Sequence, residues 1–114
     1  MDGNGYLTLN NCKVFGNSVC GGAFALTVID SYIEQLSVWN IYTYYGDVPM
    51  TIRNSDVTFQ FDDALIYEII NGYYNDKKIQ IDSKSKIKLP NQLKTAVINN
   101  QVFEIEEGAE ITYY

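Results

Sequence analysis

The sequence contains no histidine, and this absence excludes several kinds of site at once. A histidine-dependent catalytic triad, a histidine metal site and a charge switch near neutral pH all need an imidazole. Basic residues are also few, with eight against fourteen acidic residues and Arg53 as the single arginine. The small lysine cluster at residues 84–88 reads as a solvated strand face, and it lacks the clustered positive charge that displaces counterions from phosphates. We therefore expect no direct nucleic-acid binding.

Cysteine and long apolar runs are scarce as well. Cys12 and Cys20 match neither a CxxC motif nor a zinc set, so free thiols are expected, and a disulfide stays open if the protein is exported. No run of eighteen apolar residues exists, so we expect no insertion into a membrane. The opening residues, MDGNGYLTLN, have neither a positive start nor an apolar stretch, so no signal peptide is expected. If the protein acts outside a cell, we expect this chain to be part of a longer protein.

Aromatic residues, in contrast, are plentiful: ten Tyr, five Phe and one Trp make up 14% of the chain. Tyr and Phe favour half-buried pleated surfaces, which indicates strands. With 114 residues, the chain has the length of one domain.

Three octets of nearly the same pattern supply the architecture: LTLNNCKV at 7–14, LTVIDSYI at 26–33 and MTIRNSDV at 50–57. Apolar residues at the first, third and eighth places, with Thr at the second, predict alternating strands. Asn or Asp at the fifth place tolerates a left-handed backbone and bends a strand at little cost. The small residue at the sixth place (Cys, Ser, Ser) can then point inward. Each octet therefore predicts a strand, a tight bend and a second strand.

Such a unit buries its apolar face only by stacking on copies of itself, as in solenoids. We predict an all-β fold, a short right-handed parallel β-helix with a C-terminal strand cap. Residues 1–114 form one module, with coils over about 5–90 and the cap over about 91–114, formed for example by an antiparallel hairpin. Lys84, Lys86 and Lys88 are interpreted as charges that protect an edge strand. The alternative is a β-sandwich in which the similarity of the three octets is coincidental.

The segment FDDALIYEIINGYYND, which contains residues 62–72, interrupts the repeat. As a helix it would start at a cap on Asp62 or Asp63 and end at Asn71-Gly72. As a strand it would turn at the same Asn-Gly into YYNDKKIQI. Amphipathic spacing favours the helix, whereas the β-branched and aromatic residues favour the strand. We take the strand as the expectation and leave the helix open.

The coils LTLNNCKVFGNSVCGGA, LTVIDSYI and MTIRNSDVTFQF, with KKIQIDSKSKIKLP as a closing coil, resemble known repeats. They are similar to the right-handed parallel β-helix repeats of bacterial, clostridial-type surface carbohydrate-binding proteins. The resemblance covers roughly residues 5–90 and departs at the inserted segment. It implies a polysaccharide ligand and an extracellular or cell-surface location.

Candidate ligand-binding residues are aromatic, because exposed rings stack on the apolar faces of sugars. The segment VWNIYTYYGDVP supplies Trp39, Tyr42, Tyr44 and Tyr45, and YYND supplies Tyr73 and Tyr74. The alternative is that these rings cover loop edges and fill the core.

Asp62 and Asp63 are a candidate calcium site through their oxygen ligands, with a loop or a helix cap as the alternative. No other cofactor is expected.

Some parallel β-helices are polysaccharide lyases or hydrolases, which need clustered or paired carboxylates. The acids here are dispersed and form no catalytic constellation, so we expect a non-catalytic binding module. Two alternatives remain. One is a small acidic phage-type protein that binds and inhibits a protein partner, and the other is a coil segment of a fibre or tailspike, which would form a homo-oligomer.

Overall fold

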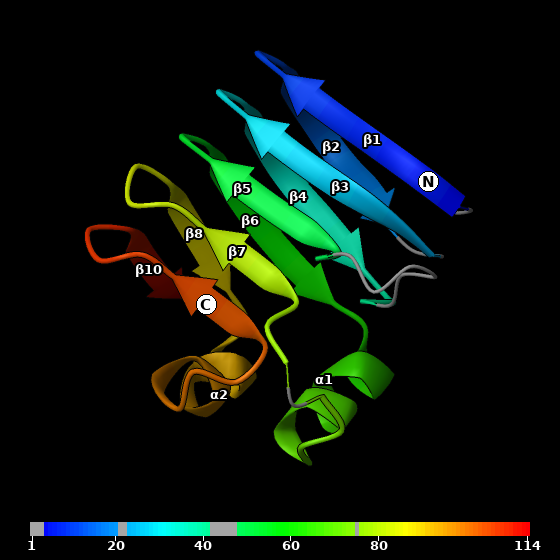
Figure 1. Cartoon of the computed structure of the whole chain (residues 1–114), viewed down its shortest axis with the longest axis vertical. Helices are drawn as coiled ribbons and strands as arrows, with labels where there is room; N and C mark the ends of the chain where they lie inside the picture. Colours follow the sequence, from blue (N-terminus) through cyan, green and yellow to red (C-terminus); the bar gives the residue numbers. More distant parts are fainter. Residues whose placement is uncertain (1–3, 21–22, 42–47, 75) are drawn as a thin grey trace.

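The computed structural model describes residues 4–20, 23–41, 48–74 and 76–114, and consists mainly of two five-stranded sheets (Figure 1). Sheet A, in front in Figure 1, contains β1 (Asn4–Asn10), β3 (Ala23–Ile29), β5 (Met50–Arg53), β7 (Ile79–Ile81) and β9 (Phe103–Ile105) in this order. Sheet B, behind it, contains β2 (Lys13–Cys20), β4 (Tyr32–Val38), β6 (Asp56–Phe61), β8 (Lys86–Leu89) and β10 (Glu110–Tyr113), also in spatial succession.

The chain alternates between the two sheets, so that each pair of consecutive strands forms one coil of a solenoid. Every strand pairing within the two sheets is parallel. The predicted parallel β-solenoid is therefore confirmed, and the β-sandwich alternative, whose hairpins and Greek keys pair strands antiparallel, is excluded.

The bends lie where the octets place them. Asn11, Asp30 and Asn54 adopt left-handed φ angles of 58°, 50° and 45° between a strand of sheet A and a strand of sheet B. The Asn54 side chain donates a hydrogen bond to Asp30 Oδ1 at 2.8 Å, which ties neighbouring bends together. The fifth octet position therefore has the backbone conformation that its residue type predicted.

A ladder of buried serines runs along the inside of these bends. Ser31, Ser55 and Ser85 are 6%, 4% and 1% exposed. The Ser31 N–H donates to Ser55 Oγ at 3.0 Å, and the Ser55 N–H donates to Ser85 Oγ at 3.2 Å. At the N-terminal end, the Cys12 N–H donates to Ser31 Oγ at 3.0 Å. Because buried polar groups cost free energy unless they are hydrogen-bonded, this ladder makes the tight bends compatible with burial.

The fourth bend is longer and is organised by Asp82 instead of a left-handed Asn. Its Oδ1 accepts hydrogen bonds from the Ser85 hydroxyl at 2.7 Å and from the Asn54 and Lys84 N–H groups at 3.0 Å and 3.2 Å. Partial burial opposes ionisation of the carboxyl, but these hydrogen bonds outweigh it and hold the pKa of Asp82 below its ordinary value.

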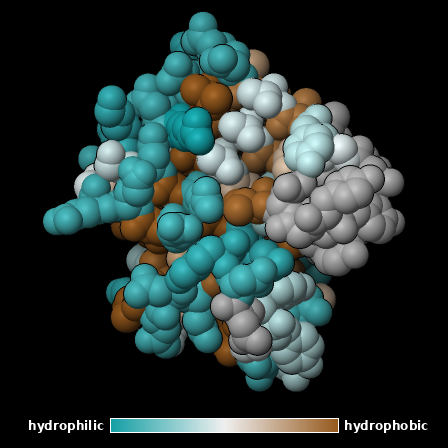
Figure 2. Space-filling view, viewed as in Figure 1, coloured by the Kyte–Doolittle hydropathy of each residue, from teal (hydrophilic) through white to brown (hydrophobic). Residues whose placement is uncertain are grey.

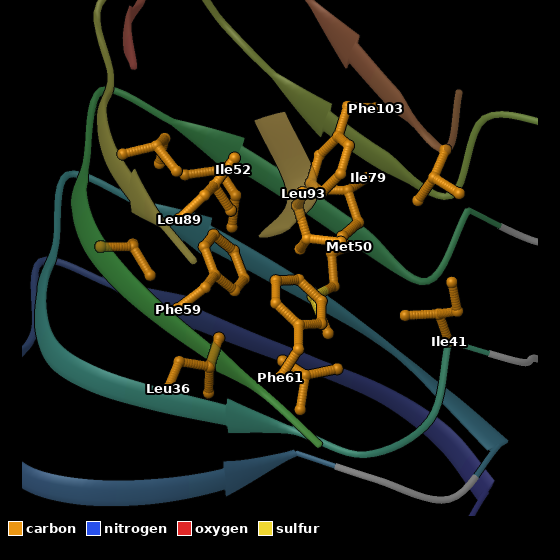
Figure 3. Packing of buried hydrophobic residues seen from close by; sticks show 14 of the residues in the cluster. Leu36, Ile41, Met50, Ile52, Phe59, Phe61, Ile79, Leu89, Leu93 and Phe103 are labelled. Atoms are coloured by element: carbon orange, nitrogen blue, oxygen red, sulfur yellow. The ribbon is translucent and has the colours of Figure 1, made fainter. Parts of the chain in front are cut away.

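The core fills the space between the sheets with the apolar residues of the octets stacked in register. Leu26 pairs with Met50, which pairs with Ile79, and this row continues to Phe103. Phe59 and Phe61 project from β6 toward the opposite sheet, with ring centroids 5.6 Å apart (Figure 3). All of these side chains are less than 5% exposed, so the stack of coils forms one continuous core.

Helices occupy the side opposite the bends (Figure 1). The strand expected over residues 62–72 is wrong, because α1 (Asp63–Ile70) lies there, with Asp62 accepting a hydrogen bond from the Ala64 N–H at 3.2 Å. Leu65, Ile66 and Ile69 are buried. The amphipathic spacing outweighed strand propensity because a helix buries these three residues on one face.

The C-terminal part also differs from the expected hairpin. Residues 91–98 form η1 (Asn91–Leu93) and α2 (Lys94–Ile98), and the two strands that follow join different sheets in parallel. They are the last strands of the solenoid, but they form a fifth coil and no antiparallel hairpin. Because β8 has partners on both sides, Lys86 and Lys88 lie on an exposed face and do not protect an edge.

None of the helices in the described part of the chain is long and apolar enough to cross a membrane.

Candidate ligand-binding face

The predicted aromatic residues fall in different places. Trp39 directly follows β4 and is 47% exposed. Tyr73 follows α1, is 61% exposed, and meets the Tyr67 ring edge-on with centroids 6.3 Å apart. The remaining tyrosines of the first aromatic segment, Tyr42, Tyr44 and Tyr45, lie outside the residues that the structure describes.

Tyr74 packs against the core and does not present an exposed ring for a ligand. It is half-buried against the core, and its hydroxyl lies 3.3 Å from Glu68 Oε1. Burial raises the pKa of Tyr74, and the negative charge of Glu68 adds to this effect. Of the two tyrosines in YYND, only Tyr73 therefore exposes most of its ring.

Trp39 lines a cleft of about 290 Å³ on the outer side of sheet B, where β2, β4 and β6 lie next to one another. The indole shares this cleft with two amides, a hydroxyl and a carboxylate, because the full lining consists of Asn17, Ser37, Val38, Trp39, Gln60, Phe61 and Asp62. Each polar residue comes from a different coil or from the end of one, so the stacking of the coils brings them together.

Hydrogen bonds fix the polar groups of this cleft in a row across three strands. Ser37 Oγ lies 2.7 Å from Asn17 Oδ1 and 3.3 Å from Gln60 Oε1. Gln60 Oε1 also accepts a hydrogen bond from the Gln35 amide. The row therefore presents oriented amide and hydroxyl groups to solvent before any ligand arrives.

A second aromatic group lies at the opposite end of sheet B. The rings of Phe15 and Tyr32 are 5.7 Å apart and tilted by 44°, with exposed fractions of 71% and 36%. Tyr32 begins β4 and Trp39 follows its end, which separates them by about 23 Å at ~3.3 Å per residue. Sequence reasoning missed this pair, although the seventh octet place, which follows the inward sixth residue, should point Tyr32 outward.

Beside Tyr32, a hollow of about 510 Å³ follows the bends, with Lys13, Asp56 and Lys86 among its lining residues. It is the polar margin of the same sheet face, because all three residues begin strands of sheet B. The outer face of sheet B therefore carries an aromatic group at each end of its strands, with polar side chains between the two groups.

The outer face of sheet A has a different character. A hollow of about 140 Å³ on this face is lined by residues such as Thr51, Gln80 and Glu104, and its lining contains no aromatic ring. Figure 2, which views this face, shows hydrophilic residues over much of the surface with apolar residues between them.

The predicted calcium site has no cluster to support it in the described residues. Asp62 uses its carboxylate to cap α1, and Asp63 is exposed in the first helical turn. No group of three or more Cys, Asp or Glu side chains that could hold a metal ion occurs within residues 4–20, 23–41, 48–74 and 76–114. Cys12 is a free thiol, and the Cys20 side chain lies outside the described side chains.

Comparisons of the chain with protein-family models, with curated proteins and with solved structures found no match. These comparisons therefore identify no family for the chain.

Proposed function

We propose that the chain is a non-catalytic binding module that holds a neutral polysaccharide on the outer face of sheet B. The observation that carries this proposal is the cleft in which the exposed Trp39 ring lies beside the hydrogen-bonded row of Asn17, Ser37 and Gln60. Carbohydrate sites combine these two elements, an aromatic surface for the sugar ring and a few placed polar groups for its hydroxyls.

The chemistry of the row fits sugar hydroxyls, which both donate and accept hydrogen bonds. The carboxamides of Asn17 and Gln60 each carry a donor and an acceptor, as does the Ser37 hydroxyl. Because Ser37 already donates to Asn17 and Gln60 already accepts from Gln35, a ligand would spend little free energy on ordering these groups.

Charge favours a neutral ligand at this end of the face. Asp62 lines the cleft and is exposed, so its carboxylate accepts hydrogen bonds from hydroxyls and repels anionic sugars. The net charge of −6 acts in the same direction at longer range.

The extent of the face favours a chain of sugars over a single one. Trp39 and the Phe15–Tyr32 pair provide platforms about 23 Å apart along β4, at roughly 3.3 Å per residue. The resemblance to clostridial-type surface β-helices implies the same class of ligand and a location at the cell surface or outside the cell.

A binding role is preferred over catalysis because of the carboxylates at this cleft. Glycoside hydrolysis uses two carboxylates about 5–10 Å apart across the scissile bond. Among the residues that line the Trp39 cleft, Asp62 is the one acid, and it already caps a helix.

The test is a titration of the protein with neutral and acidic polysaccharides, followed by the fluorescence of Trp39, the one Trp of the chain. We expect a saturable change with neutral chains. Calorimetry then compares Gln60→Ala with Gln80→Ala, which removes the same amide from the outer face of sheet A.

Gln60→Ala is expected to weaken binding by about fivefold or more, the cost of one to two hydrogen bonds, whereas Gln80→Ala leaves it unchanged. A flat response to every polysaccharide, or equal losses in the two variants, would refute sugar binding on sheet B. A flat response would turn attention to a protein partner.

A further inference from the structure

We propose that the two ends of this solenoid are complementary, so that copies of the chain stack end to end with β9 and β10 of one copy against β1 and β2 of the next. This interaction goes beyond polysaccharide binding and does not depend on it, because stacking uses the strand edges and inward residues of the terminal coils, whereas the proposed sugar site uses side chains on the outer face of sheet B.

Both ends of the solenoid leave strand edges without a partner in the described structure. β1 pairs only with β3 and β2 only with β4, while β9 pairs only with β7 and β10 only with β8. Unpaired edges are templates for another strand. Since all strands of a sheet run in one direction, the C-terminal coil of one copy can add to the N-terminal coil of another in the parallel arrangement used throughout the molecule.

The core is also unfinished at both ends. Inward residues of the middle coils, such as Val28, Ile52 and Ile81, are at most 1% exposed. Their counterparts in the terminal coils are only partly buried, namely Leu7, Leu9 and Val14 at one end and Ile105, Ala109 and Ile111 at the other. Stacking would place these two sets in the register of neighbouring coils and remove both from water.

Charge selects the head-to-tail arrangement. The first residues of the sheet B strands form one column, in which Lys86 stands between Asp56 and Glu110. The column begins at Lys13 on β2, passes through the uncharged Tyr32 on β4, and ends at Glu110 on β10, and the Lys13 and Glu110 side chains are exposed. A stacked copy therefore continues the alternation by placing Lys13 beside Glu110, and opposite charges on neighbouring strands stabilise a sheet.

The backbone at the bends repeats the same contact at every step between coils. In each sheet B strand after β2, the N–H of the first residue donates to the carbonyl of the residue that precedes the sheet B strand of the previous coil, at 2.9–3.0 Å. The four instances run from Tyr32 to Cys12, from Asp56 to Ser31, from Lys86 to Ser55 and from Glu110 to Ser85. The next member of this series is the Lys13 N–H of a second copy on the Ala109 carbonyl.

Stacking of this kind does not close on itself, so it gives an open series of oligomers in place of a single dimer. The experiment is sedimentation velocity over a range of concentrations, with wild type, Lys13→Glu and Glu110→Lys. Lys88→Glu is the matched control, since it makes the same charge change on an exposed lysine within the sheet.

We expect wild type and the Lys88→Glu control to form species beyond the dimer as concentration rises. Each end variant should associate about fivefold or more weakly, because like charges then face each other. An equimolar mixture of Lys13→Glu and Glu110→Lys should regain association, since every interface in the mixed stack again joins opposite charges.

Three outcomes would overturn the proposal. The first is a wild type that stays monomeric at every concentration. The second is a closed dimer insensitive to Glu110→Lys, and the third is a mixture that associates no better than its components. If the protein is monomeric but still binds polysaccharide, only the stacking proposal is rejected. If it stacks but binds no sugar, only the proposed function is rejected.

Discussion

Replacing Ser55 with alanine tests whether the serine ladder holds the bends of the solenoid together. Ser55 is 4% exposed; its Oγ accepts the Ser31 N–H at 3.0 Å and donates to the Arg53 carbonyl at 2.7 Å. Ser55→Ala leaves the buried Ser31 N–H without its acceptor. An unsatisfied buried donor costs about 1–3 kcal/mol, so we expect the free energy of unfolding to fall by about 2 kcal/mol.

Urea unfolding and thermal melting measure this loss. For a chain of this size, about 2 kcal/mol corresponds to a fall in Tm of roughly 8 °C. Ser83→Ala is the matched control, because Ser83 is an exposed serine of the fourth bend and should change stability by less than about 0.5 kcal/mol. Ser55→Cys should fall between the two, since Cys12 occupies the equivalent place and its Sγ lies 3.4 Å from the Asn10 carbonyl.

The refuting result is equal stability of the Ser55→Ala and Ser83→Ala variants at an unchanged urea m-value. An unchanged m-value shows that both variants expose the same surface on unfolding. Equal stability would mean that the Ser31 N–H finds another partner or that the ladder contributes nothing to the bend.

Three further predictions concern the bends and the start of α1. Asn54→Ala, at φ 45°, should lose about 1–2 kcal/mol in urea unfolding, and Asn54→Gly less; equal losses would exclude backbone strain as the cause. Because the folded pKa of Asp82 is lowered, its contribution to stability is present above about pH 4 and is lost as the pH falls further. Asp82→Asn should flatten this acid dependence, measured by urea unfolding at several pH values. Asp62→Ala should lower the free energy of unfolding by about 1 kcal/mol in thermal melting, and Asp63→Ala should lower it less, because Asp62 caps α1. If Asp62 acts as a cap, the difference between the two variants should be the same in calcium and in chelator.

Most of the fold could be predicted from the octet repeat, because each position of the octet has a fixed physical role. Thr27 and Thr51 stand in register, and the left-handed Asp30 and Asn54 turn the chain at the same level of successive coils. The fourth and fifth coils were harder to recognise because their bends work differently. Asp82 organises one bend with its carboxylate, and Gly108, at φ 104°, stands in the other, where no Asn or Asp occurs.

The helix α1 could not be decided from residue types alone. Ile66, Ile69 and Ile70 are β-branched and favour a strand, but propensity is weaker than burial. Ile66 and Ile69 are buried in the helix, whereas Ile70 is 52% exposed, so the apolar face of the helix determined the outcome.

The candidate site was predicted only in part, because two β-bulges change which side chains face outward. Continuing the alternation from the inward Ile33 would turn Ser37 into the core, but a register shift between Ile33 and Leu36 points it outward instead. A second shift lies between Val14 and Asn17 on the neighbouring strand. Beyond the shifts, Asn17 stands opposite Gln35 and Ser37 stands opposite Gln60, in a register that the octets do not reach. The Ser37 side chain reaches Asn17 from this register. The sequence pointed to Trp39 as a candidate aromatic residue, but the polar row of its cleft exists only because these bulges re-aim one stretch of β2 and one of β4.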